Sequence, residues 1–369
     1  MTETAQEKAA RARAELLAHV RFNLLFQDGD FALTDWSDTG DLSAGCIAKT
    51  AFRSARFDRA RLGAVQFIEA DFTAAVFRAA VVRETIFIRC DLSGASFAGA
   101  TIEKATFIAC AMPAAGFGGA TVTESTFLQC DLTAARFADA QLNGAVLLDC
   151  TIAEIDLSGV AAQRLFVSKA DLRAARLDGL SCESALLADA DLSERDLTSV
   201  RLARCNLMGA NLTGAVLTGM DIAGSFFLQC TARGADFSGA AASAAHFSKS
   251  DLSGARFTGA RLDNANFMQA RLGGADFSGA DLEMAVMTQA QAPGARFTGA
   301  NLAYTQFAQA RLDGADASRA RFLRTNFHRA SLTGLARLDA SGSVTETEPA
   351  RAVAELYAPQ RVRPWQEED

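Results

Sequence analysis

The chain has 369 residues, of which 50% are hydrophobic and 21% are charged, and its net charge is −7. That charge divides into −3 in residues 1–40, −3 in residues 336–369 and only −1 in the long middle. A near-neutral middle argues against direct nucleic-acid binding, which needs an excess of Lys and Arg. The sequence shows no signal-peptide pattern and no run of 18 apolar residues, so we expect a cytoplasmic protein without a membrane partner.

Residues 1–39 are predicted to form a helix followed by a cap. Strong helix formers fill residues 4–20, with Thr4 as the N-cap and Glu7 three places later. Residues 22–36 are aromatic and apolar but lie outside the register of the region that follows. We expect them to cover its end, where core and strand edges would otherwise be exposed.

Residues 40–335 keep a five-residue period. Every position whose number ends in 2 or 7 is apolar from Leu42 to Leu332, and the residue two places earlier is usually small. A period of five matches neither the 3.6 of a helix nor the 2 of a strand. One period sustained over this length predicts a solenoid, in which each unit buries its apolar side by stacking on its neighbours.

Four pentapeptides are predicted to make one turn, because like residues recur every 20 positions. Cysteine stands at 90, 110, 130 and 150, and phenylalanine at 67, 87, 107 and 127. Glycine recurs at the last place of the later repeats, as at Gly214 and Gly219, where a corner needs a positive φ.

The core is predicted to keep a constant volume along the rod. Between about residues 147 and 222 the central Phe gives way to smaller residues. In exchange, the position that usually carries a small residue carries a larger one, at Ile155, Val160, Leu165, Leu180, Val200 and Met220. Arg195 breaks the pattern, and since a buried charge is costly, we expect it to pair with Glu194 or Asp196 or to be turned outward by a bulge.

The recurring segments ANLTGA and ADFSGA, as at residues 210–215 and 275–280, resemble the pentapeptide-repeat family. The family pattern is a small residue, Asp or Asn, Leu or Phe, and two variable positions. The resemblance covers about residues 40–335 and implies an all-β solenoid, a right-handed quadrilateral β-helix. About 15 coils at the ~4.8 Å spacing of adjacent strands would make a rod on the order of 70 Å long.

Residues 336–369 are predicted to form a linker, a short helix beginning at Pro349, and an acidic tail. In the family such C-terminal helices cap the rod or pair two rods. The resemblance therefore implies end-to-end or dimer contacts at Leu356 and Tyr357.

The sequence predicts no catalytic, metal or cofactor site, and we expect a protein that is not an enzyme. His19, His246 and His328 are interpreted as surface residues, and the cysteines as mostly buried free thiols, with Cys46 alone in an outward place. Aspartates at 71, 91, 131, 171, 191 and 251 line one outward column, where we expect them to satisfy turns and to solvate that face.

One of the four outward faces is apolar where the others are polar. We call this set the apolar stripe: Ile68, Ile86, Ile88, Ile108, Leu128, Val146, Leu148, Phe166, Leu186, Phe226 and Leu228. A contiguous exposed apolar patch of this length marks an interface. Three occupants are open: the chain's own helix through Leu16, Leu17 and Val20, a second copy in a homodimer, or a different protein partner.

The leading hypothesis is a noncatalytic scaffold or adaptor that holds a protein partner on the stripe. The resemblance allows a role beside bacterial type VI secretion systems. The alternative that it implies is a DNA mimic, which inhibits or protects DNA gyrase or topoisomerase in the manner of quinolone resistance. A mimic of the phosphate backbone needs a strongly negative rod, which the near-neutral coil is not.

Overall fold

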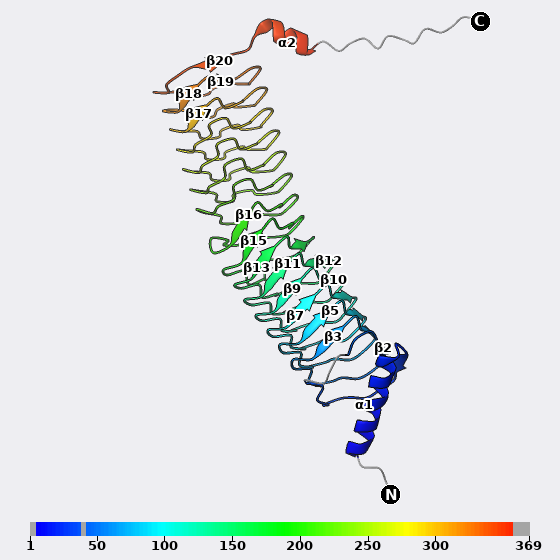
Figure 1. Cartoon of the computed structure of the whole chain (residues 1–369). Coiled ribbons are helices and arrows are strands. Elements are labelled where there is room, and N and C mark those ends of the chain that lie inside the picture. The colour runs from blue at the N-terminus through cyan, green and yellow to red at the C-terminus, as the bar shows by residue number, and fades with distance from the viewer. Residues whose placement is uncertain (1–4, 38–41, 357–369) are drawn as a thin grey trace, which may run out of the picture.

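The structure is a computed structural model that describes residues 5–37 and 42–356. They form a β-solenoid of about 16 turns with a short helix at each end (Figure 1), which confirms the expected all-β solenoid. Helix α1 spans Ala5–Arg21 and helix α2 spans Pro349–Leu356, close to the two predicted helices. In the described part of the chain, neither helix has the length and apolar character of a membrane span.

Strands stack in parallel on two neighbouring faces of the turns. The first sheet contains β1 (Leu25–Gln27), β2 (Cys46–Ala48), β4 (Gln66–Ile68), β6 (Ile86–Ile88), β8 (Thr106–Ile108), β10 (Thr126–Leu128), β12 (Val146–Leu148) and β14 (Phe166–Val167). The second contains β3 (Arg61–Gly63), β5 (Val81–Arg83), β7 (Thr101–Glu103), β9 (Thr121–Thr123), β11 (Gln141–Asn143), β13 (Ala161–Gln163), β15 (Ser181–Glu183) and β16 (Arg201–Ala203). Two short pairs follow, β17 (Asn301–Ala303) with β18 (Arg321–Leu323), and β19 (Thr325–Asn326) with β20 (Val344–Thr345).

Beside these two sheets, the other two faces consist of tight turns joined by single β-bridges. The bridges connect residues 20 apart, such as Asp71 with Asp91, which confirms four pentapeptides per turn. At these turns the amide of the small residue donates to the carbonyl of the central apolar residue three positions earlier, as Ala55 does to Phe52 at 3.0 Å. These corners therefore have a local hydrogen bond in addition to the bonds between turns.

The corners use the left-handed backbone conformation. A positive φ recurs at nearly every fifth residue over residues 44–339. Gly214 (φ 66°) and Gly219 (φ 69°) adopt it without steric cost, as predicted. Earlier turns impose it on residues with side chains, for example Glu84 at φ 53°. Stacking on the next turn thus outweighs the local preference of these residues.

Phenylalanine columns fill the core of the early turns. Phe107 is fully buried and stacks between Phe87 and Phe127, with ring centroids 4.8 Å away on each side. This distance is close to the ~4.8 Å between adjacent strands, so one spacing satisfies both the backbone hydrogen bonds and the ring stacking.

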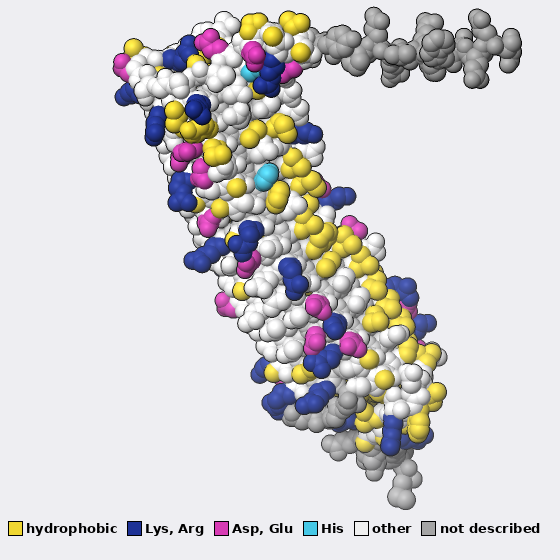
Figure 2. All heavy atoms as spheres, turned by 45° about the horizontal axis from the view of Figure 1, so that its top comes forward, with side chains coloured by type: hydrophobic (Ala, Val, Ile, Leu, Met, Phe, Trp, Pro, Cys, Tyr) yellow, Lys and Arg dark blue, Asp and Glu magenta, His cyan; other side chains and the backbone are white. Residues whose placement is uncertain are grey.

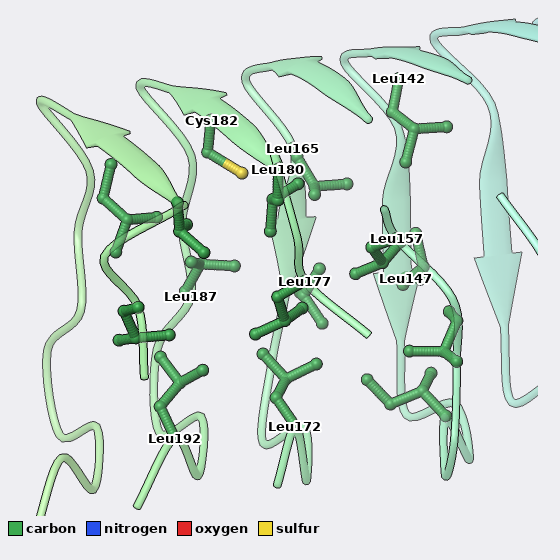
Figure 3. Close-up of a pocket in the computed structure, with 16 residues that line it drawn as sticks. Leu142, Leu147, Leu157, Leu165, Leu172, Leu177, Leu180, Cys182, Leu187 and Leu192 are labelled. Atoms are coloured by element: carbon green, nitrogen blue, oxygen red, sulfur yellow. The ribbon is translucent and has the colours of Figure 1, made fainter. Parts of the chain in front are cut away.

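Leucine replaces phenylalanine in the middle of the rod. The six enlarged residues of the small slot are all buried, as predicted. The exchange of volume is nevertheless incomplete, because a narrow cavity of about 20 Å³ remains among side chains such as Leu157, Leu177 and Leu187 (Figure 3). Its lining is aliphatic except for Cys182, so a water molecule would find almost no polar partner there.

The segment before the regular repeats is a first turn displaced by one residue. Strand β1 pairs with β2 in the register Leu25 with Cys46, which is 21 residues rather than 20. Phe26, Phe31 and Trp36 follow one another at intervals of five, and all three are buried. This turn buries its own aromatic side chains against the first regular turn.

Helix α1 packs against that first turn and does not lie along the rod (Figure 1). Leu16 and Val20 are buried, and a side chain at Gly45 would collide with Val20. The Arg13 guanidinium lies 4.8 Å from the centre of the Trp36 ring. The alternative in which the chain's own helix covers the apolar stripe is therefore wrong, because the first turn already uses the helix's apolar side.

Phe107→Ala should lower the free energy of unfolding by about 3–5 kcal/mol, because it removes a ring stacked on both sides in a closed core. Urea unfolding followed by circular dichroism measures this loss. Phe226→Ala is the matched control, since that ring is 45% exposed, and it should cost less than about 1 kcal/mol. Equal losses in the two variants would contradict the assignment of the core.

Candidate functional site

The apolar stripe is the outer surface of the first sheet and its continuation. The strand register places Ile68, Ile88, Ile108, Leu128 and Leu148 directly above one another, one residue per turn. A neighbouring column joins Val146 to Phe166 through strand pairing and Phe166 to Leu186 through a bridge. Residues 20 apart in sequence thus become neighbours at the ~4.8 Å spacing of strands.

The side chains of the stripe are accessible. Ten of the eleven predicted residues are half-buried, and Phe226 is exposed. Met208 and Met268, in the same outward column as Leu228, are also exposed. Figure 2 shows hydrophobic side chains gathered in a band along the rod. The structure thus brings the predicted residues to one face.

The predicted C-terminal contact residues have no described side-chain contacts. Leu356 is the last residue of α2, and Tyr357 lies outside the described residues.

His328 is buried and so differs from the expected surface position, whereas His246 is half-exposed and makes a ring contact that was not expected. The His246 ring stacks on Phe226, with centroids 4.8 Å apart and planes at 14°, and so extends the stripe by one turn. His328 is buried at 3% exposure, and its Nε2 lies 3.2 Å from a Glu355 carboxylate oxygen. The 20-residue period places His246 above Phe226, but α2 contacts His328 from outside the repeats, which no period predicts.

A polar latch holds α2 on the last turns. Glu355 accepts hydrogen bonds from Arg329 at 3.1 Å and Arg351 at 2.9 Å and also contacts His328. The Arg329 guanidinium, followed by His328, lowers the pKa of Glu355 to about 2. The ionised carboxylate therefore favours the docked helix.

Aspartates of the outward column satisfy turns, as predicted. Asp131, for example, accepts from the amide of Thr133 at 3.0 Å and from its hydroxyl at 2.6 Å. The same amide contact, two residues ahead, occurs for Asp71, Asp91, Asp171, Asp191 and Asp251. These carboxylates stabilise corners through local hydrogen bonds.

Another column carries alternating charges that pair with one another. Arg176 lies 4.0 Å from Asp156, one turn below, and Arg296 lies 4.0 Å from Asp276. Arg256 pairs with Asp236 in the same way. The positive and negative charges of this face therefore compensate one another along the rod.

Arg195 pairs with neither of its expected partners. Its guanidinium reaches the previous turn and donates to the carbonyls of Arg173 at 2.9 Å and Ala175 at 2.7 Å, while its Nε is buried without a partner. The side chain is half-buried. The carbonyls of the neighbouring turn take the place of a counter-ion.

All eight cysteines are free thiols. Burial raises the pKa of Cys182 to about 12 and that of Cys230 to about 11, so both stay protonated and unreactive at neutral pH. The Cys90 sulfur lies 3.4 Å from the Phe67 carbonyl oxygen, a contact that later thiols of the column repeat. Within residues 5–37 and 42–356, no group of three or more His, Cys, Asp or Glu is placed to hold a metal ion.

Two models of known protein families match most of the repeat region. The model described as "Pentapeptide repeat region" matches residues 82–157, and "Pentapeptide repeats (8 copies)" matches residues 205–248, 250–289 and 295–334. No curated protein sequence matches the chain significantly.

Several solved structures share short or distant similarity with the chain. A pentapeptide repeat protein from the thylakoid lumen of Arabidopsis thaliana is 29% identical over 28% of this chain and 67% of its own, with a TM-score of 0.22. Full-length QnrB1, a plasmid-mediated fluoroquinolone resistance protein, is 19% identical over 68% of this chain and 96% of its own, with a TM-score of 0.21. HetL of the cyanobacterium Nostoc sp., involved in heterocyst differentiation regulation, is 19% identical over 86% of this chain and 85% of its own, with a TM-score of 0.14.

Thiol labelling at neutral pH should modify Cys46 first, because its side chain is half-exposed at an outward position. Cys150 is also only partly buried, and it should react more slowly because it occupies an inward position and its contact with Cys130 raises the pKa of its thiol. The buried thiols should react only after denaturation, when mass spectrometry should count eight adducts. Rapid native labelling of Cys182 or Cys230 would contradict their placement in the core.

Glu355→Gln should release α2, because it removes the carboxylate that binds Arg329 and His328. Hydrogen exchange of residues 349–356 measures the release. Since the folded pKa of Glu355 is about 2, below its ordinary 4.5, the latch is intact above about pH 4.5 and is lost as the pH falls through about 2. Unchanged exchange in the variant at pH 7 would show that the latch does not hold the helix.

Proposed function

Because this chain belongs to the pentapeptide-repeat family, we propose that it is a noncatalytic protein-interaction scaffold whose contact surface is the apolar stripe. The observation that carries the proposal is the continuity of the stripe. It presents accessible Ile, Leu, Val and Phe side chains in vertical register from Ile68 to Leu228. An exposed apolar surface of this extent is costly in water unless a protein covers it.

The neighbouring faces support the same assignment by contrast. Their outward side chains are largely occupied within the chain: aspartates bind turn amides, and arginines pair with aspartates one turn away. Such groups gain little from a partner, because they already have local hydrogen bonds. The outward apolar side chains of the stripe have no comparable partners within the chain.

The paired charges weigh against the DNA-mimic alternative. A mimic must present uncompensated negative charge, as the phosphate backbone does. In the column that includes Asp156, Asp236 and Asp276, an arginine stands beside each carboxylate. A supercoiling assay tests this alternative directly, and we expect no inhibition or protection of gyrase.

Ile88→Lys, Ile108→Lys and Leu128→Lys together should abolish capture of the bound protein. Each desolvated apolar contact is worth about 1–2 kcal/mol, so the three should weaken binding by more than a hundredfold. Quantitative co-purification, with the tagged full-length chain expressed in its own cells, measures the loss.

The matched control places three lysines on the neighbouring sheet, as Thr101→Lys, Thr121→Lys and Gln141→Lys. These residues also point outward from three successive strands. The control should retain the partner, and circular dichroism should show the same fold in both variants. Equal capture by the stripe variant and the control would refute the stripe as the contact surface.

A further inference from the structure

The size of the side chains changes in opposite directions in the two columns of the stripe. In the first column, which here is the one that contains Val146, the small Thr106 and Thr126 precede the large Phe166 and Leu186. The rung that contains Val146 and Leu148 stands midway between them.

The second column shows the reverse order. The large Ile108 and Leu128 lie below that middle rung, and the small Ser168 and Ala188 lie above it. For two rungs below the middle rung, large side chains stand in one column and small side chains in the other, and for two rungs above it the columns exchange these roles.

We propose that a second copy of this chain packs on the stripe in antiparallel orientation, about a two-fold axis through the Val146–Leu148 rung. This inference rests on the proposed function, since it names the protein that the stripe binds. Rotation about an axis parallel to the strands turns the two faces toward each other and reverses the rods. It also keeps each column opposite the same column of the second copy.

The rotation brings large side chains opposite small ones throughout the centre. In the first column Thr126 faces Phe166 of the second copy. In the second column Leu128 faces Ser168 of the second copy. The rungs one step further out repeat the pattern, with Thr106 opposite Leu186 and Ile108 opposite Ala188. Alternation of large and small residues across facing positions is how packed layers interdigitate.

Charges along one corner of the stripe agree with the same register. Glu124 faces Arg164 of the second copy, Glu84 faces Arg204 of the second copy, and all four side chains are exposed. Arg204 also pairs with Glu183 of its own chain. Gly144 lies on the axis at this corner, where the absence of a side chain lets the two copies approach.

A shift of the register by one rung destroys this agreement. A shift of the axis toward the N-terminal end of the rod places Lys104 opposite Arg164 of the second copy. A shift toward the C-terminal end places Lys104 opposite Arg204 of the second copy. A parallel dimer is less favourable in charge, because it would pair Glu84 with Arg89 but place Arg164 opposite Lys169, whereas the antiparallel register pairs both Glu124 and Glu84 with arginines. In the proposed register the one like-charge pair is Asp149 with its own symmetry mate, and Lys169 lies one turn away in the same column.

The contact is large enough for a specific dimer. Eight steps of ~4.8 Å from Ile68 to Leu228 give a length of about 38 Å, and a five-residue face is about 16 Å wide. The two copies would then bury about 1,200 Å² in total, at the lower edge of the range for specific interfaces. We therefore expect a dimer whose population rises with protein concentration.

A charge exchange tests the register. Glu124→Arg and Arg164→Glu each place like charges opposite one another twice in the dimer, so each variant alone should be a monomer. Mixed together, the two variants should form a heterodimer, because every new charge then faces its opposite. Analytical ultracentrifugation of the full chain, of each variant and of the mixture measures the mass, and monomers in all four samples would overturn the proposal.

Cysteine cross-linking tests the axis. Leu148→Cys lies beside the two-fold axis and should form a disulfide-linked dimer under mild oxidation. Ile88→Cys lies three turns away on the same column, so its symmetry mate is about 29 Å distant and it should not cross-link. The wild-type chain, with its own half-exposed Cys46, sets the background.

The outcomes separate this inference from the proposed function. Equal cross-linking of both cysteines would indicate a parallel dimer and overturn the antiparallel one. A monomeric protein whose stripe variant still loses a different bound protein would overturn the second copy as occupant and leave the scaffold proposal standing. A stripe variant that loses neither self-association nor any bound protein would overturn both.

Discussion

The structure depends on one constraint: each turn of 20 residues rises by a single strand spacing. Backbone hydrogen bonds between turns set that rise at ~4.8 Å, and every side chain is then repeated at the same distance by the residue 20 places later. The spacing suits aromatic stacking, which explains the phenylalanine columns. It also suits alternating ion pairs, since Arg176 reaches Asp156 only because one turn separates them.

The same constraint explains where the core is imperfect. A fixed cross-section must be filled by two inward residues per face, and leucine at both slots does not fill it as completely as phenylalanine with alanine. The cavity beside Leu177 is the consequence. Arg195 belongs to the same stretch, where the polar guanidinium reaches carbonyls that are left accessible by the turn below.

The repeats of a solenoid cannot cover the core at its two ends, and this chain covers each end in a different way. At the N-terminus a displaced turn and α1 bury Phe31 and Trp36. At the C-terminus Gly342 passes so close to Phe322 that a side chain would collide with its carbonyl oxygen, and the chain then leads to β20 and the α2 latch. The chain itself thus covers the core at both ends, although Phe22, Leu24, Leu25 and Leu33 of the N-terminal segment stay exposed, and the long stripe is a separate apolar surface along the side of the rod.

The sequence by itself determined the solenoid, the four repeats per turn, the inward residues and the members of the stripe. These follow from a period of five with like residues 20 apart, and strict periodicity turns sequence distance directly into spatial neighbours. The roles of the outward aspartates followed for the same reason, because the contact of Asp131 with Thr133 lies within one repeat.

Only the tertiary structure decided the features that break the period. It placed α1 at the end of the rod instead of on the stripe, buried His328 beneath α2, and gave Arg195 two carbonyl partners in place of a carboxylate. These contacts join segments with no repeating relation to each other. Their geometry depends on how non-repeating segments pack against the finished rod, which no local pattern encodes.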